Sequence, residues 1–294
     1  MAVKRWLVGC IVLLLGTLAT VTLALLVVNL SLEQDGLALG TFSKRVGLIE
    51  IVGDIESSEG VVDQLEHMRL DSTVRAVVLR LDSPGGGVGA SQEIYEAVRK
   101  VRDADKPVIA SMGGVAASGA YYIACAADSI VANPGTLTGS IGVIMSFPNT
   151  EELFKKVGVR FEVVKTGKFK DIGSLSRPMT PEEKELLQTV LSNVYEQFVN
   201  AISEGRGLER RDILPYADGR IFSGDQAQAY GFVDRLGDLN DAIQLAAGMA
   251  DIKGRPVVVR KERRRVSLID LFQDKLHLVP GLSQSGPRLE YRLR

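Results

Sequence analysis

Apolar residues follow two different spacings along the chain, and their alternation predicts repeated strand and helix units. Short apolar runs, which are typical of buried strands, occur at residues 46–53, 76–82, 107–112 and 129–134. Between them, apolar residues recur every three to four positions, as on one face of a helix, at residues 57–70, 90–101 and 118–127. Strands and helices that alternate in this way form a largely parallel, buried sheet. We therefore expect an α/β fold.

The second half of the chain continues this alternation. Thr180 begins a long helix that runs to about residue 203, because a proline and two glutamates follow it. No long linker follows residue 46, so we expect one domain there. The remaining expected elements are a helix near residues 151–157, a strand at 159–167, a turn, short helix and strand over 217–237, a helix at 239–249 and a strand at 255–260.

The longest apolar run lies at the N-terminus. Residues 7–30 carry no charge, and Lys4 and Arg5 precede them. As a helix this run spans about 36 Å, more than the ~30 Å of a bilayer core, whereas the apolar region of a cleaved signal peptide is shorter. We interpret residues 1–30 as a cytoplasmic N-terminus and a transmembrane signal anchor. The two positive charges place the rest of the chain outside the inner membrane of a bacterium.

Composition narrows the classes of function. The chain has 294 residues, is 46% hydrophobic and 24% charged, and carries a net charge of −1. These values are typical of a globular protein and give no indication of nucleic-acid binding. Two cysteines, Cys10 and Cys125, and two histidines, His67 and His277, form no metal or redox motif. We therefore expect no cofactor and no metal ion.

Three short segments carry residues that could do chemistry. The first is Ser-Pro-Gly-Gly-Gly at residues 83–87, which follows a predicted strand. Ligands of α/β proteins gather at the carboxyl ends of strands, and glycines there let the backbone come close to a ligand. The segment fits a tight turn between a strand and a helix equally well.

The second segment contains Ser118, which lies among small residues at a predicted helix start. A serine in this position is usually only a cap, and its small neighbours also suit close packing. The first N–H groups of a helix are unpaired, however, and lie at the positive end of its dipole. The amide of Gly119, and that of Gly86 if the two loops meet, could stabilise the oxyanion that forms when Ser118 attacks a carbonyl.

The third segment, Lys-Thr-Gly-Lys-Phe-Lys-Asp at residues 165–171, could supply the base that a nucleophilic serine needs. Neither histidine supports a Ser-His-Asp triad, because one lies in an amphipathic helix pattern and the other in the tail. A lysine needs burial to act as a base, since a free lysine has a pKa of about 10.4. Phe169 and Ile172 beside Lys170 could provide apolar cover, although three lysines in seven residues are also typical of a solvated loop.

Taken in order, these segments resemble peptidase family S49, the signal peptide peptidase A family. The matching motifs are LDSPGGGV, GGVAASGAYYIA, TGSIGVI, KTGKFKD, and DGRIFSGDQA with GFVDRLG. They cover roughly residues 46–237, and the chain length resembles the short, single-repeat form of the family. The resemblance implies a ClpP/crotonase-like fold of repeated ββα and βα units. We accordingly divide the chain into an anchor (1–30), a linker (31–45), a peptidase domain (46–260) and a basic tail (261–294).

The resemblance also implies roles for individual residues. It implies that Ser118 is the nucleophile and that Lys170, rather than Lys168, is the general base of a Ser-Lys dyad. The amides of Gly86 and Gly119 are implied to form the oxyanion hole. In this family the two dyad residues come from neighbouring subunits, so a homo-oligomer is expected. The implied activity is the hydrolysis of peptide bonds in remnant signal peptides or other apolar peptides near the membrane.

Several alternatives stay open at this point. A related branch of S49 peptidases cleaves segments of membrane proteins. A crotonase-like acyl-CoA enzyme would use similar paired amides, although its coenzyme is cytoplasmic, and a non-catalytic scaffold would bind membrane proteins without cleaving them. For the basic tail, we weigh a solvated surface segment against docking on anionic lipids or on the domain near the substrate entrance.

Overall fold

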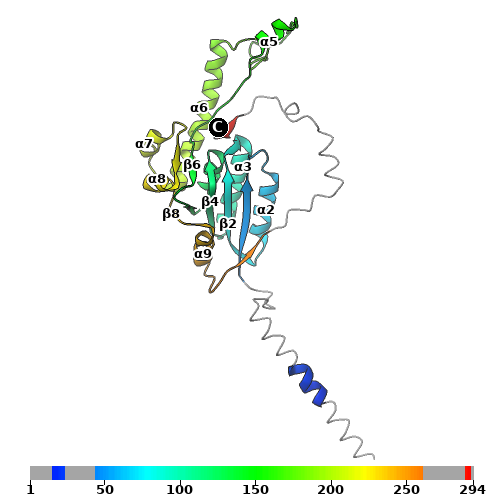
Figure 1. Ribbon diagram of the computed structural model, residues 1–294, viewed down its shortest axis with the longest axis vertical. Coiled ribbons are helices and arrows are strands. Elements are labelled where there is room, and N and C mark those ends of the chain that lie inside the picture. Colours follow the sequence, from blue (N-terminus) through cyan, green and yellow to red (C-terminus); the bar gives the residue numbers. More distant parts are fainter. Residues whose placement is uncertain (1–14, 24–43, 261–288, 293–294) are drawn as a thin grey trace, which may run out of the picture. The chain divides into compact units, whose positions relative to one another are not determined.

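The computed structural model describes residues 15–23, 44–260 and 289–292. Residues 15–23 form a helix with exposed side chains (Figure 1). Within the described ranges, no helix is both long and apolar enough to cross a membrane. Most of the predicted anchor and linker, much of the tail, and the residues Cys10 and His277 lie outside the described residues. The chain divides into two units, residues 1–43 and residues 44–294, and the second contains the fold described below.

An eight-stranded sheet forms the centre of this second unit. Its strands are β1 (Arg45–Val52), β2 (Val74–Ser83), β4 (Val108–Ala117), β5 (Ser129–Ala132), β6 (Leu137–Gly139), β7 (Ile221–Ser223), β8 (Arg235–Leu236) and β9 (Val257–Val259). Their order is β7-β6-β4-β2-β1-β9; β5 also pairs with β4, and β8 pairs with β5. Among the described pairs of this sheet, only β6–β7 is antiparallel. The expected largely parallel sheet is therefore confirmed.

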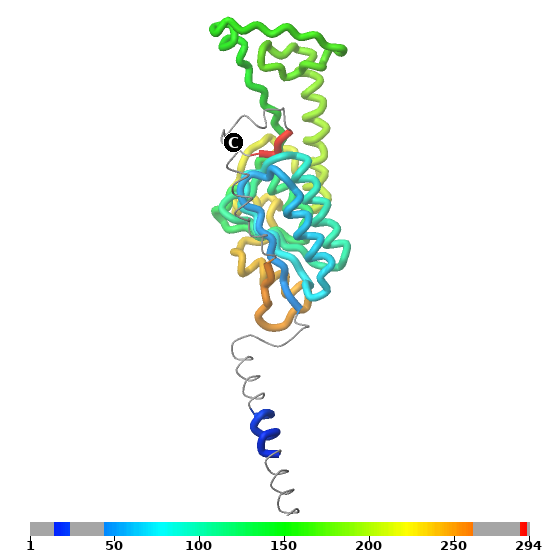
Figure 2. Tube along the Cα trace, turned by 90° about the vertical axis from the view of Figure 1, so that its right-hand side faces the viewer, coloured from blue at the N-terminus to red at the C-terminus, as the bar shows by residue number. Residues whose placement is uncertain are grey.

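Helices cover both faces of the sheet because successive residues of a strand point to opposite sides. Leu48 of β1 joins a core cluster with Ile243 of α9 (Leu239–Met249). Its neighbour Ile49 joins the larger cluster on the other face. This cluster includes Leu65 of α2 (Glu59–Leu70) and Ile94 of α3 (Val88–Arg102), two helices that lie side by side in Figure 2. The helices on that larger face are α2, α3, α4 (Gly119–Ala124) and part of α6 (Pro181–Arg206).

The long helix α6 begins where the sequence predicts. The Thr180 hydroxyl accepts a hydrogen bond from the Glu183 N–H at 3.2 Å, and the Glu183 carboxylate accepts one from the Thr180 N–H at 2.8 Å. This reciprocal capping satisfies two backbone donors at the helix start. Buried residues lie mostly in the second half of α6, whereas its first turns and α5 (Glu151–Lys156) project from the strands (Figure 1). The remaining helices are α7 (Arg210–Ile213), the short 3-10 helix η1 (Leu214–Tyr216) and α8 (Gly224–Ala229).

Two predicted elements were wrong. The turn predicted at residues 83–87 contains a short strand, β3 (Gly85–Gly87), which pairs in antiparallel fashion with β10 (Glu290–Arg292) near the C-terminus. Residues 159–167 alternate apolar and polar side chains but form no strand. A strand needs a partner for its N–H and C=O groups, and no described segment pairs with this one. Its apolar residues Val159, Phe161 and Val163 are exposed instead.

Candidate active site

Ser118 lies where β4 ends and α4 begins, at the carboxyl end of a central strand. Its backbone has φ 54° and ψ −115°, a combination that residues with a Cβ rarely adopt. Two backbone hydrogen bonds hold it there. The Ser118 N–H donates to the Gly139 carbonyl at 2.8 Å, and the Tyr122 N–H donates to the Ser118 carbonyl at 2.8 Å. The strand and helix on either side therefore fix a strained residue in one orientation.

The hydroxyl of Ser118 has no structural task among the described residues. Ser118 is 1% exposed, and its Oγ has no hydrogen-bond partner in the described part of the chain. It also makes no capping bond to α4, so the cap interpretation is wrong. Leaving a buried polar group unpaired costs about 1–3 kcal/mol, and such a group calls for an explanation such as catalysis.

The glycine loop at residues 83–87 meets the start of α4. A Cβ atom built on Gly119 would lie 3.3 Å from the Gly86 nitrogen, and one built on Gly85 would lie 2.7 Å from the Gly119 nitrogen. Gly85 also has φ 103°, which favours glycine. A Cβ on Gly86 would lie 2.3 Å from the Ile55 carbonyl oxygen. The structure therefore brings the amides of Gly86 and Gly119 close together, and only residues without a side chain fit this approach.

The C-terminal strand β10 lies directly on this glycine loop. Tyr291 pairs with Gly86, and the Val88 N–H donates to the Leu289 carbonyl at 3.1 Å. In antiparallel strands, hydrogen-bonded pairs of residues alternate with pairs that are not hydrogen-bonded. Val88 and Leu289 form one hydrogen-bonded pair, so Gly86 and Tyr291, two residues further along each strand, form the next. A Cβ on Gly119 would lie 3.2 Å from the Tyr291 carbonyl oxygen. The described end of the tail thus docks on the domain beside Ser118.

The opposite edge of β10 is also paired. Ile144 and Glu290 exchange two backbone hydrogen bonds of 3.1 Å. The strand therefore runs between the glycine loop and the segment after β6. A cavity of about 540 Å³ lies on one side of it, bordered by Gly87, Gln92 and Leu289, and one of about 720 Å³ lies on the other, bordered by Ile144 and Tyr195. A peptide in the place of β10 would point its alternate side chains toward such cavities.

The side chain of Tyr291 fills an aromatic pocket and is fully buried. Its ring stacks on Tyr122 with centroids 5.2 Å apart, and it contacts Phe198 at 4.8 Å. Its hydroxyl donates to the Val194 carbonyl at 3.0 Å. Burial raises the pKa of this phenol well above its ordinary value. At the other end of the strand, Arg292 forms an ion pair with Asp54 at 2.7 Å.

The structure does not bring Lys170 to Ser118. Lys170 is exposed on the loop between α5 and α6, and in the described part of the chain its side chain makes no hydrogen bond or ion pair. The expected apolar cover is absent, because Phe169 beside it is 38% exposed. Lys168, the alternative base, pairs with Glu182. Within one chain the expected nucleophile, Ser118, and its expected base, Lys170, are therefore apart.

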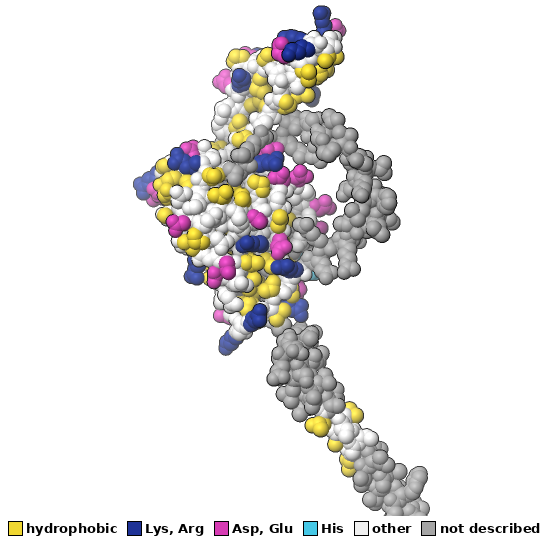
Figure 3. Space-filling view, viewed as in Figure 1, with side chains coloured by type: hydrophobic (Ala, Val, Ile, Leu, Met, Phe, Trp, Pro, Cys, Tyr) yellow, Lys and Arg dark blue, Asp and Glu magenta, His cyan; other side chains and the backbone are white. Residues whose placement is uncertain are grey.

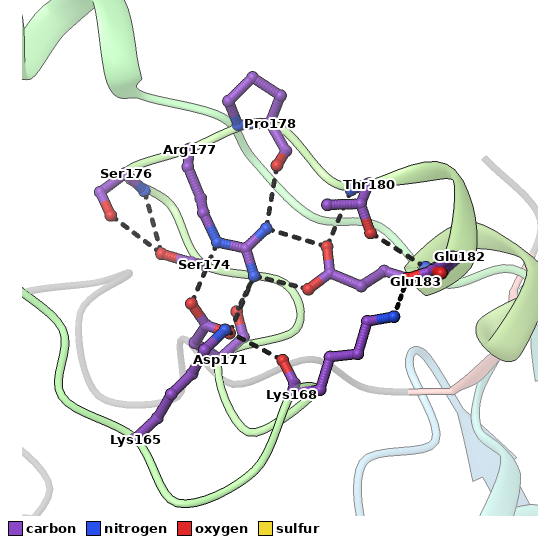
Figure 4. A network of polar contacts seen from close by, with 10 residues as sticks. All are labelled: Lys165, Lys168, Asp171, Ser174, Ser176, Arg177, Pro178, Thr180, Glu182 and Glu183. Carbon is purple, nitrogen blue, oxygen red and sulfur yellow. Dashed lines mark hydrogen bonds and ion pairs between the residues drawn. The ribbon is translucent and has the colours of Figure 1, made fainter.

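A polar network surrounds the lysine loop (Figure 4). Asp171 accepts hydrogen bonds from Arg177 at 3.0 Å and from Lys165 at 2.5 Å, and these bonds hold the pKa of its carboxyl well below the ordinary value. Arg177 also donates to Glu183 at 2.5 and 2.9 Å. With the Thr180 N–H as a second donor, it lowers the pKa of Glu183 to about 2. The loop is thereby tied to the first turn of α6.

Sequence reasoning missed several residues of this site. Tyr291 carries no motif, and its pairing with a glycine loop leaves no side-chain pattern to recognise. Ser91 of α3 is buried with an unpartnered hydroxyl, and that oxygen would lie 2.5 Å from a Cβ on Gly119. Arg177 follows the lysine motif, and only its charge opposite Asp171 could have indicated the contact.

The other candidate groups have structural surroundings. His67 lies in α2, and Cys125 is fully buried after α4, where burial raises the pKa of its thiol to about 12. Among the described residues, no group of His, Cys, Asp and Glu side chains could hold a metal ion.

Comparison with known proteins agrees with this arrangement. Residues 42–135 match the family model of Clp protease, which fits the mostly parallel sheet of this α/β fold. Residues 100–253 match the model of peptidase family S49. The chain belongs to peptidase family S49. It is a serine peptidase, and the resemblance deduced from the motifs is confirmed.

Individual relatives of this S49 peptidase are named as proteases. "Putative protease slr0021" of Synechocystis sp. is 44% identical over 211 residues, which are 71% of this chain and 76% of that protein. "Protease 4" of Salmonella typhi is 40% identical over 190 residues, which are 65% of this chain but 31% of that longer protein. "Putative signal peptide peptidase SppA" of Enterococcus faecium is 37% identical over 185 residues, covering 63% of this chain and 54% of that protein.

Proposed function

We propose that this S49 peptidase is a membrane-anchored endopeptidase that uses a Ser-Lys dyad on apolar peptides near the membrane. The observation that carries the proposal is the buried, unpartnered hydroxyl of Ser118 beside the neighbouring amides of Gly86 and Gly119. Acyl transfer needs a free nucleophile and fixed donors for the oxyanion in one place. The carboxyl ends of two adjacent parallel strands, β2 and β4, position these groups.

In the proposed reaction, Ser118 Oγ attacks the carbonyl carbon of the scissile peptide bond while the uncharged Lys170 Nζ takes the hydroxyl proton. The amides of Gly86 and Gly119 bind the oxyanion of the tetrahedral intermediate. Protonated Lys170 then gives its proton to the leaving amine, and the acyl group stays on Ser118. Water then attacks the acyl carbon and loses a proton to Lys170. The acyl group leaves as the carboxylic acid, and protonated Lys170 returns its proton to Ser118 Oγ, which restores the hydroxyl and the uncharged lysine.

We propose that Lys170 reaches Ser118 from a neighbouring subunit of a homo-oligomer. Lys170 is exposed beyond the strands of its own chain, and the hydroxyl of Ser118 has no partner among residues 15–23, 44–260 and 289–292 of that chain. The part of the chain around α5 also carries exposed apolar side chains (Figure 3), among them Val159, Phe161 and Val163. Clustered exposed apolar residues are typical of protein–protein contacts. They support a subunit interface on the part of the chain around α5.

The position of β10 supports an extended binding mode for the substrate. A peptide that adds as an antiparallel strand to Gly85–Gly87 and Ile144 would be held by main-chain hydrogen bonds. Such bonds do not depend on the peptide's sequence, and apolar side chains would fit the flanking cavities. Remnant signal peptides and segments of membrane proteins both meet this description. The anchor proposed for residues 1–30 would keep the peptidase domain beside the extracytoplasmic face of the inner membrane, where such peptides gather.

Two single variants and their mixture test the dyad and its sharing between subunits. Ser118→Ala and Lys170→Ala should each abolish cleavage of an apolar reporter peptide while circular dichroism stays unchanged. After subunit exchange, an equal mixture should regain about a quarter of wild-type activity, because random pairing joins an intact serine to an intact lysine in that share of sites. Wild-type activity in either variant would refute the dyad, and an inactive mixture would place both residues in one subunit. A fluorophosphonate adduct mapped to the Ser118 peptide is the independent check on the nucleophile.

A further inference from the structure

The three lysines of residues 165–171 have different surroundings. Lys165 Nζ lies 2.5 Å from Asp171 Oδ1 and donates to the Lys168 carbonyl at 2.9 Å. Lys168 pairs with Glu182 and lies 5.5 Å from the ring of Phe169. The side chain of Lys170 has no hydrogen bond or ion pair in the part of the chain that the structure describes. The unpaired lysine is thus the one that we propose as the general base.

The carboxylate that could pair with Lys170 is the next residue, Asp171, and it is already occupied. Its Oδ2 accepts from Arg177 Nε at 3.0 Å, and its Oδ1 lies 2.9 Å from Arg177 Nη2 and 2.5 Å from Lys165 Nζ. Its side chain is only 14% exposed. Figure 4 shows both cations pointing at the Asp171 carboxylate. Two positive charges therefore hold this one negative charge.

Arg177 is itself fixed at the start of α6. It forms two hydrogen bonds with Glu183, whose side chain is 3% exposed and which also belongs to the capping box with Thr180. A bidentate pair between a guanidinium and a carboxylate fixes distance and direction together. Asp171 is therefore tied through Arg177 to a helix turn, and the loop that carries Lys170 is held with it.

The charge of this arrangement matters because a nearby carboxylate favours the protonated form of a lysine. A general base has to be uncharged when it takes the proton. The described charges of the loop and of the adjoining turn of α6 balance, since Lys165, Lys168 and Arg177 face Asp171, Glu182 and Glu183. On α5, Lys155 pairs with both Glu151 and Glu152. Apart from Lys170 itself, the other charged side chains on α5, on the first turns of α6 and in the segment between them are Lys156, Arg160, Glu162, Lys184 and Glu185.

We propose that Arg177, together with Lys165, is a positioning residue that withholds Asp171 from Lys170, so that the base is presented without a carboxylate partner. The inference rests on the proposed role of Lys170 as base. It goes beyond that role because it assigns a task to two residues outside the dyad. Arg177 acts through Asp171 and touches neither the substrate nor Ser118.

The test compares the pH dependence of kcat/KM for the full-length chain with an apolar reporter peptide. Arg177→Gln leaves Asp171 held by Lys165 alone, so the carboxylate pairs with Lys170 for part of the time and then holds its proton. The acid limb of the profile should move up by about one pH unit, and kcat/KM at neutral pH should fall about tenfold. KM should change little, because Arg177 and Asp171 act on the protonation of Lys170 and not on the groups that bind the peptide. Arg177→Gln combined with Asp171→Asn should return the acid limb to its wild-type position, since the competing carboxylate is gone.

Two further variants keep the result interpretable. Lys165→Gln should shift the acid limb of the kcat/KM profile in the same direction by a smaller amount. If Arg177→Gln does not fold, this variant tests the inference in its place. Arg211→Gln is the matched control, because Arg211 pairs with Glu209 at 2.9 Å on an exposed helix and should leave the profile unchanged. A lower kcat with an unmoved acid limb, or a limb that Asp171→Asn does not restore, overturns the inference. Failure of the proposed function looks different, because Lys170→Ala would then remain active.

Discussion

Tyr291 lies opposite Gly86 in an antiparallel strand pair, and its ring is enclosed by Tyr122 and Phe198. The peptide carbonyl of Tyr291 is close to Gly119, the residue after Ser118. The C-terminal strand therefore occupies the edge of the domain at which Ser118 and the amides of Gly86 and Gly119 lie.

Removal of residues 289–294 should make this edge available to other peptides. We expect KM for a short reporter peptide to fall several-fold while kcat stays the same. The same deletion should lower the melting temperature, because loss of a fully buried aromatic side chain costs about 3–5 kcal/mol. Steady-state kinetics and thermal unfolding measure the two effects. Deletion of residues 293–294 alone is the matched control, and an unchanged or higher KM in the longer deletion contradicts the expectation.

Two neighbouring glycines should respond differently to the same substitution. In Gly86→Ala the new Cβ would lie 2.3 Å from the Ile55 carbonyl oxygen, so the loop and its amide must move. Displacing one oxyanion donor lowers kcat by about 100- to 1,000-fold. In Gly87→Ala the nearest described atom would lie at 3.6 Å, an ordinary contact, and activity should stay within a few-fold of wild type. Equal activities of the two variants would show that the Gly86 amide does not donate a hydrogen bond to the oxyanion.

Two inactive variants of Ser118 should differ in stability. Ser118→Ala and Ser118→Gly both remove the unpartnered hydroxyl, but only glycine adopts φ 54° without strain. We expect Ser118→Gly to be more stable than Ser118→Ala by about 1 kcal/mol, the usual scale of such backbone strain. Urea unfolding of both variants measures the difference. A more stable Ser118→Ala would mean that the surrounding structure relaxes around the Cβ.

Acid should weaken the domain through Glu183. Hydrogen bonds from Arg177 and the Thr180 N–H lower its pKa to about 2, below its unfolded value of about 4.3. A carboxyl with a lowered folded-state pKa stabilises the fold fully above its unfolded pKa, and that contribution is lost as the pH falls toward 2. Urea midpoints measured between pH 6 and pH 2.5 should therefore drop. Glu183→Gln should flatten this drop, Glu185→Gln on the same helix should not, and parallel curves for all three proteins would contradict the assignment.

The elements whose pattern is local were predicted well. Helix α9 has the predicted bounds, and Thr180 caps α6 as the Thr-Pro-Glu-Glu sequence indicates. The meeting of Gly86 and Gly119 also follows from the pattern, because the carboxyl ends of adjacent parallel strands share one edge of the sheet. The sequence left this meeting as a condition for the Gly86 amide, and the strand order of β2 and β4 meets that condition.

The elements that depend on a distant partner could not be predicted. Strand β3 consists of three glycines, which carry no side-chain alternation, and its partner β10 lies near the other end of the chain. Residues 159–167 have the alternation of a strand but no described partner, so the pattern alone gave the wrong element. Lys170 belongs with these cases. Its motif pointed to a role beside Ser118, but a single chain places the two residues apart.

One edge of a sheet holds one strand at a time, so any peptide that binds at Gly85–Gly87 competes with β10. Its apparent affinity equals its intrinsic affinity multiplied by the fraction of molecules whose edge is vacant. With a vacancy of about 20%, a peptide would need roughly a fivefold higher concentration to reach half-saturation. For the proposed peptide substrates, β10 would then set a concentration threshold. Peptides that accumulate next to the enzyme exceed it, and dilute peptides with the same side chains do not.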